Sequence, residues 1–126
     1  MMTLGLLRRF RETSELRFTG CELWVTVLMY QIIKSATFDE WLGGLRDRQA
    51  RVRILTRIDR LAGGNPGDVK PVGSGVSELR VHYGPGYRVY FAQRGGIVVL
   101  LLCAGDKRTQ SADIERAVAI AADWQE

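Results

Sequence analysis

The chain has 126 residues, which is enough for one domain with a single modest core. Its apolar content of 46% and charged content of 25% are ordinary for a globular protein, and its net charge of +4 favours an anionic partner such as nucleic acid. With only two cysteines, Cys21 and Cys103, and one histidine, His82, the sequence excludes a disulfide framework, a zinc-finger spacing and a His-rich metal site. We therefore expect a cytoplasmic protein without a metal or cofactor.

Residues 1–28 differ from the rest of the chain. Four arginines lie in the first 17 residues, ahead of an apolar run at 23–33. This run lies late and no small-residue cleavage site follows it, which argues against a signal peptide. It is also shorter than the roughly 20 residues that span a bilayer, so we expect no membrane association. We divide the chain into a poorly ordered or mis-assigned N-terminal extension (1–28) and a domain (29–126), and a tail that adds a helix or strand is the alternative.

Hydrophobic periodicity and turn signals predict an α+β domain with the order β-α-α-β-β-β-β-α. The expected elements are a strand at 30–34, a helix opening at a Thr37–Glu40 capping box, a helix at 47–62, strands at 70–72, 78–83, 87–91 and 97–104, and a last helix capped by Thr109 or Ser111. The eight apolar residues at 97–104 indicate a strand buried on both faces. Helices should therefore cover both sides of the sheet.

Segment 78–91 reads as a β-hairpin, because apolar and polar residues alternate on both sides of a Gly-Pro-Gly turn at 84–86. A three-residue turn predicts Tyr83 opposite Tyr87, Val81 opposite Val89, and Leu79 opposite Phe91. These six residues form an apolar face directed to the core. The other face then carries Glu78, Arg80, His82, Arg88 and Tyr90.

The polar face of this hairpin is a candidate catalytic surface. Arg80 and Arg88 share it, and the loop after the central strand supplies Lys107 and Arg108. Fixed cations of this kind stabilise the phosphorane-like transition state that forms when a 2′-hydroxyl attacks the adjacent phosphate of RNA. His82 is a candidate acid or base. The structural alternative is an ion pair between Arg80 and a carboxylate such as Glu78, with a plain surface histidine.

The second helix offers a further basic surface. Its candidate RNA contacts are Arg53, Arg57 and Arg60, to which we add Lys70 on the edge strand and Tyr90 on the hairpin. An acidic stretch of a partner protein is another candidate ligand. The alternative is an ordinary solvated helix face and a solvated edge lysine.

Three stretches also resemble a known family: residues 78–80, 84–91 and 105–107. They are similar to the RelE/HigB-type toxins of bacterial toxin–antitoxin modules, in the addiction-module killer protein branch, from about Met29 to the C-terminus. The resemblance implies a RelE-like, mainly antiparallel sheet of four to five strands, with two N-terminal helices and one C-terminal helix. It also implies a ribosome-dependent mRNA endonuclease, and a small helix-turn-helix antitoxin as partner.

By this resemblance, Arg88 and Arg108 match positions that family members use for cleavage, and Arg80 and Lys107 fit the pattern of the branch. Two features depart from it. The tyrosine that some relatives carry in the last helix is Ile114 here, and the strand-borne lysine pair is absent. The general base is therefore unassigned. Two other functions stay open: a gyrase poison of the ParE type, which shares the fold, and an inactive binding relic.

Overall fold

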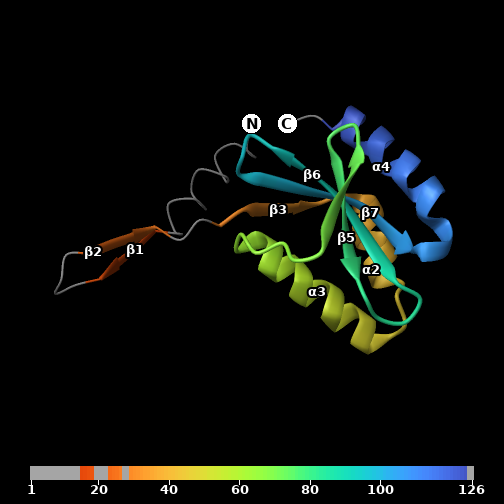
Figure 1. Cartoon of the computed structure of the whole chain (residues 1–126), viewed down its shortest axis with the longest axis horizontal. Helices are drawn as coiled ribbons and strands as arrows, with labels where there is room; N and C mark the ends of the chain where they lie inside the picture. Colours follow the sequence, from red (N-terminus) through yellow and green to blue (C-terminus); the bar gives the residue numbers. More distant parts are fainter. Residues whose placement is uncertain (1–14, 19–22, 27–28, 125–126) are drawn as a thin grey trace.

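Five strands form one mixed sheet in the order β3-β7-β6-β5-β4, seen in the computed structural model of the chain (Figure 1). The structure describes residues 15–18, 23–26 and 29–124. The elements of the sheet domain are β3 (Gln31–Lys34), α2 (Ala36–Gly43), α3 (Arg48–Ala62), β4 (Val69–Gly73), β5 (Val76–Val81), β6 (Tyr87–Arg94), β7 (Val98–Asp106), the 3-10 turn η1 (Lys107–Thr109) and α4 (Gln110–Asp123). This order confirms the predicted α+β domain, and only β3 runs parallel to its neighbour, β7.

Two further strands precede the domain. β1 (Glu15–Phe18) and β2 (Leu23–Thr26) pair antiparallel, with Glu15 opposite Thr26. The other residues of the expected extension, and with them the predictions about its order and start, lie outside the described part of the chain. Among the helices that are described, none is long and apolar enough to cross a membrane.

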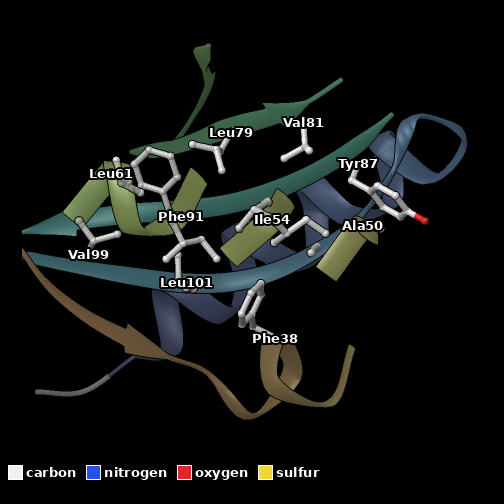
Figure 2. Close-up of a cluster of buried hydrophobic side chains, with 13 residues drawn as sticks. Phe38, Ala50, Ile54, Leu61, Leu79, Val81, Tyr87, Phe91, Val99 and Leu101 are labelled. Carbon is white, nitrogen blue, oxygen red and sulfur yellow. The ribbon is translucent and has the colours of Figure 1, made fainter. Parts of the chain in front are cut away.

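Strand β7, which lies between β3 and β6, is buried on both faces, as its apolar run predicts. Val99 and Leu101 pack with α2 and α3 on one face, where Phe38, Ile54 and Leu79 join them (Figure 2). On the other face, side chains of β6 and β7 pack against Ala117 and Ala121 of α4. Helices therefore cover both sides of the sheet.

Side-chain caps set where α2 and α3 begin. Ser35 Oγ accepts a hydrogen bond from Phe38 N at 3.0 Å and donates one to the carbonyl of Leu102 at 2.6 Å. The predicted capping box at Thr37 is therefore wrong, because a serine tied to the neighbouring strand starts α2 two residues earlier. For α3 the expected start is confirmed, since Asp47 accepts from Ala50 N at 3.1 Å.

The predicted register of the β5–β6 hairpin is also wrong, by two residues. Leu79 pairs with Val89 and Val81 with Tyr87. The connection is longer than a three-residue turn and includes a hydrogen bond from Gly86 N to the carbonyl of Tyr83 at 3.0 Å. Its two glycines both have positive φ, at 58° and 84°. Because the shift is an even number of residues, every side chain keeps the face that the alternation predicts.

Candidate functional site

A buried carboxylate, Glu78, lies at the centre of the polar face of β5 and β6. Its side chain has no exposed surface. Arg80 Nε lies 3.2 Å from Glu78 Oε1, and Arg88 Nη1 lies 3.1 Å from Glu78 Oε2. Both arginines are partly covered, with 29% and 12% of their side chains exposed. The structure therefore brings together Arg80 and Arg88 and confirms the structural ion pair between Arg80 and Glu78.

Two neutral groups complete the surroundings of this carboxylate. Gln110 at the start of α4 donates to Glu78 Oε2 at 2.6 Å, and the Tyr90 hydroxyl donates to the same oxygen at 3.3 Å. Burial opposes ionisation, but the hydrogen bonds from Arg80, Gln110 and Arg88 outweigh it and lower the pKa of Glu78 below its ordinary value. The carboxylate is therefore charged at neutral pH.

The strand register explains why this acid is needed. Arg80 and Arg88 are directly opposite each other in the β5–β6 ladder. Like charges in that position destabilise a strand pair. Glu78, two residues before Arg80 on the same face, places one negative charge beside both guanidinium groups. The cluster of these three side chains keeps one net positive charge.

The turn after β7 brings two more cations to the same end of strands β5 and β6. Arg88 pairs with Gly105 in the β6–β7 ladder, so the residues that follow lie beside the β5–β6 turn. A methyl group at Gly86 would lie 3.8 Å from Lys107 Cβ. Arg108 is 81% exposed and its Nη2 lies 2.9 Å from Asp106 Oδ2. Lys107 is exposed as well, so the predicted grouping of this loop with Arg88 agrees with the fold.

A close approach between Gly105 and the side chain of Asp113 on α4 constrains this turn. A Cβ atom added at Gly105 would lie 1.9 Å from Asp113 Oδ2, which is impossible without movement. Asp113 is buried and accepts a hydrogen bond from Thr109 Oγ1 at 2.5 Å and one from Arg116 Nη2 at 3.2 Å. Glycine is therefore required at position 105 by the approach of α4, and not by its backbone conformation.

His82 has a carboxylate partner that the sequence reasoning missed. Its Nε2 lies 2.5 Å from Asp68 Oδ2, with 74% of the His82 side chain exposed. The hydrogen bond with His82 lowers the pKa of Asp68, helped by the charge of Arg80. Asp68 directly precedes β4, and its carbonyl accepts from Arg80 N at 3.0 Å. Pairing the predicted edge strand with the hairpin would have placed Asp68 there.

The other predicted RNA contacts are scattered. Arg53 lies over the Tyr83 ring at 4.7 Å, and Arg60 and Lys70 are exposed. Arg57 instead donates to the backbone carbonyls of Arg80, Pro66 and Asp68, the last two at 3.0 and 3.3 Å. It thus ties α3 to the turn before β4.

Tyr90 was expected on the exposed polar face, but it has no exposed surface. Burial, together with the negative charge of Glu78, raises the pKa of its hydroxyl. The expected contact of Tyr90 with RNA does not fit this fold, because α4 covers that part of the face.

A second basic feature lies at the turn between α2 and α3. A hollow of about 520 Å³ is lined by Gly43, Gly44, Leu45, Arg46, Arg48 and Arg51. Arg51 Nη2 donates to the carbonyl of Leu45 at 2.6 Å. Within 29–124, Arg46 and Arg48 have no hydrogen-bonded or ion-paired side-chain partner. The Tyr83 hydroxyl lies 3.4 Å from Asp47, so this hollow neighbours the β5–β6 turn.

Together, the fold and site define a small α+β protein with a basic polar face built around one buried acid. The chain belongs to the family described as "Phage derived protein Gp49-like (DUF891)", whose sequence pattern matches residues 40–123. This family is associated with toxin–antitoxin systems. An uncharacterized protein of Haemophilus influenzae is 48% identical over 91 residues, which are 72% of this chain and 92% of that protein. The match to the family includes every residue of the site described above.

Proposed function

We propose that this protein is the toxin of a toxin–antitoxin module and that it cleaves mRNA on the ribosome, as RelE/HigB-type toxins do. The observation that carries the proposal is the pair of guanidinium groups, Arg80 and Arg88, held side by side by a buried carboxylate. Lys107 and Arg108 lie on the adjoining turn. Four cations at one end of strands β5, β6 and β7 form a site suited to a phosphate that gains negative charge.

The reaction that suits these groups is transfer of the RNA phosphate to the neighbouring 2′-oxygen. The 2′-hydroxyl loses its proton as its oxygen bonds to phosphorus, the bond to the 5′-oxygen breaks, and that oxygen takes up a proton. The products are a 2′,3′-cyclic phosphate and a free 5′-hydroxyl. Arg88 and Arg80 would stabilise the charge on the non-bridging oxygens, which builds up in the transition state.

For proton transfer we assign His82, oriented by Asp68. The side chain is exposed, so it is open to a ligand, and a carboxylate at 2.5 Å from one ring nitrogen leaves the other nitrogen free to take or give a proton. His82 is thus our candidate for the general acid or base, which the sequence alone left unassigned.

The remaining cations would guide the RNA backbone. Arg46 and Arg48 at the α2–α3 hollow lack partners in the described domain, and this hollow lies beside the β5–β6 turn. Arg53, Arg60 and Lys70 are further exposed or accessible cations. In the resting cell, the partner would be a small helix-turn-helix antitoxin that covers or neutralises this basic surface.

The test is to map new mRNA 5′ ends in translating extracts that contain the protein. We expect cuts that require ribosomes, and their loss in Arg88→Ala by at least about 100-fold, the effect of removing one transition-state donor. Lys107→Ala/Arg108→Ala should also lose cleavage, and its exposed turn makes misfolding a poor explanation. Lys34→Ala, which removes a charge on the edge strand β3, is the matched control and should cut normally.

Growth arrest without any cuts would overturn the nuclease proposal and favour a gyrase poison. DNA damage in arrested cells would then be the expected companion result. Neither cuts nor arrest would leave a binding protein without toxicity.

A further inference from the structure

We propose that Glu78 is the positioning residue of this site, which holds the guanidinium groups of Arg80 and Arg88 in the orientation that a phosphate requires. The chemical part of this inference rests on the proposed nuclease function. The positioning itself rests on the geometry of the described side chains alone.

Glu78 acts through other residues, because it has no exposed surface and so does not touch a ligand. Both of its oxygens are used. Oε1 accepts a hydrogen bond from Arg80 Nε at 3.2 Å. Oε2 lies 3.1 Å from Arg88 Nη1 and accepts a hydrogen bond from Gln110 Nε2 at 2.6 Å. A carboxylate is expensive to bury unless donors surround it in this way. The donors come from β5, β6 and α4, so the fold itself fixes where the carboxylate sits.

Each arginine keeps donors for a ligand. A guanidinium group has five N–H donors in a planar fork. Arg80 contacts Glu78 through its Nε, so both of its terminal nitrogens can donate to a ligand. Arg88 contacts Glu78 through Nη1, so its Nη2 and Nε can donate to a ligand. Since one edge of each fork is anchored, the plane of each group is set before any phosphate arrives. Preorganised donors of this kind give the largest electrostatic benefit in a transition state.

Without this carboxylate, the like charges of Arg80 and Arg88 should drive the two side chains apart. They face each other across the β5–β6 ladder and repel. Both are long side chains with many rotamers, and both have a path to solvent. An uncharged residue at position 78 should therefore release them, even where the fold survives.

The test uses Glu78→Gln, which keeps the size and removes the charge, and Glu78→Asp, which keeps the charge and withdraws it by one methylene. Side-chain NMR of arginine Nε–Hε groups reports their mobility in the full-length protein. We expect the Arg80 and Arg88 signals to be ordered in the wild type, mobile in Glu78→Gln and intermediate in Glu78→Asp. Arg48, exposed and without a described partner, is the internal control and should not change.

Cleavage in the same variants provides the second measurement. We expect kcat to fall by about 10- to 100-fold in Glu78→Gln with KM nearly unchanged, and partial recovery in Glu78→Asp. Wild-type kcat in Glu78→Gln would overturn the inference. So would a loss of cleavage with arginine signals as ordered as in the wild type, because Glu78 would then act in another way.

The two proposals fail separately. If the wild type cuts no RNA but its arginines lose order in Glu78→Gln, the nuclease function is wrong and the positioning role stands. If the wild type cuts RNA and the arginine signals are unaffected by the substitution, the nuclease function stands and the positioning role is wrong. Denaturation curves for both variants confirm that each measurement is made on folded protein.

Discussion

Glu78 and Leu79 are neighbours in β5, and neither has any exposed surface, yet they are buried in opposite ways. Leu79 points to the face covered by α2 and α3, where it belongs to the buried apolar cluster with Phe38 and Ile54. Glu78 points to the face of α4 and is surrounded by charged and polar donors. Strand β5 thus contributes an apolar side chain to one face of the sheet and a charged side chain to the other.

This difference shows what each kind of burial does. Apolar packing stabilises the fold without direction, so the side chains need only fill the space. A network of hydrogen bonds and ion pairs has direction, so it fixes how each group points. Helix α4 begins at Gln110 and leaves Arg80 and Arg88 partly open. The polar network therefore lies between the core and the solvent, where it can orient the partly exposed guanidinium groups of Arg80 and Arg88.

The largest effect that we expect on stability comes from the apolar face. Leu79→Ala should lower the free energy of unfolding by about 3 kcal/mol, because it removes buried methyl groups and leaves a cavity. Urea denaturation measures this change. Val52→Ala on α3 is the control, since Val52 is 59% exposed and its truncation should change the free energy by less than about 0.5 kcal/mol. Cleavage per folded molecule should not change, and a large loss of specific activity would contradict the separation of the two faces.

On the polar face, Gly105→Ala should cost about 2 kcal/mol, because its methyl group would overlap the Asp113 carboxylate. It should also reduce cleavage, since the turn that presents Lys107 and Arg108 must shift. The double variant Gly105→Ala/Asp113→Ala removes the overlap. We expect it to be more stable than the sum of the two single changes predicts, and additive effects would show that the contact is not tight.

The two faces should also differ in their response to acid. The pKa of Glu78 is lower in the folded chain than its ordinary 4.5, so its carboxylate contributes stability above that pH. This contribution is lost as pH falls through the lower folded pKa, and the lowered pKa values of Asp68 and Asp106 act in the same direction. We expect the free energy of unfolding to decrease below pH 4.5, and to decrease less in Glu78→Gln. Leu79→Ala should keep the full pH dependence.

The smallest effect concerns the hollow at the α2–α3 turn. Arg46→Gln/Arg48→Gln should leave stability unchanged and weaken binding of a short single-stranded RNA. The slope of log affinity against log salt should become shallower by about 0.7 for each phosphate that the protein no longer neutralises. Fluorescence anisotropy across a salt series measures it, with Lys34→Gln as the control. An unchanged slope would assign this hollow to another ligand, such as acidic side chains of a partner.

Periodicity predicted the faces of the hairpin but not its register. Alternation depends on every second residue, so it survives any even shift. The register depends on the length of the turn, and Gly84 and Gly86 support a longer turn as readily as a short one. The start of α2 was missed for a similar reason, because Ser35 becomes the cap through a contact with Leu102 that lies far away in the sequence.

The site was predicted in part. Arg80 and Arg88 follow from the alternation, and Lys107 and Arg108 follow from the order of the strands. The contact between Gln110 and Glu78 depends on how α4 packs against the sheet, and no local sequence pattern specifies this packing. The expectation for Tyr90 failed for the same reason. The sequence shows which face a strand residue takes, whereas how far a helix covers that face depends on packing.

The contact between Gly105 and Asp113 ties two positions together during the divergence of related sequences. A side chain at the first position is tolerated only after the acid at the second has been replaced or the turn has been rebuilt. Related chains that keep both residues should retain the turn carrying Lys107 and Arg108. In a related chain with alanine at the position of Gly105 and aspartate at the position of Asp113, the turn should have a different conformation. We expect such chains to lack the arrangement of Lys107 and Arg108 described above.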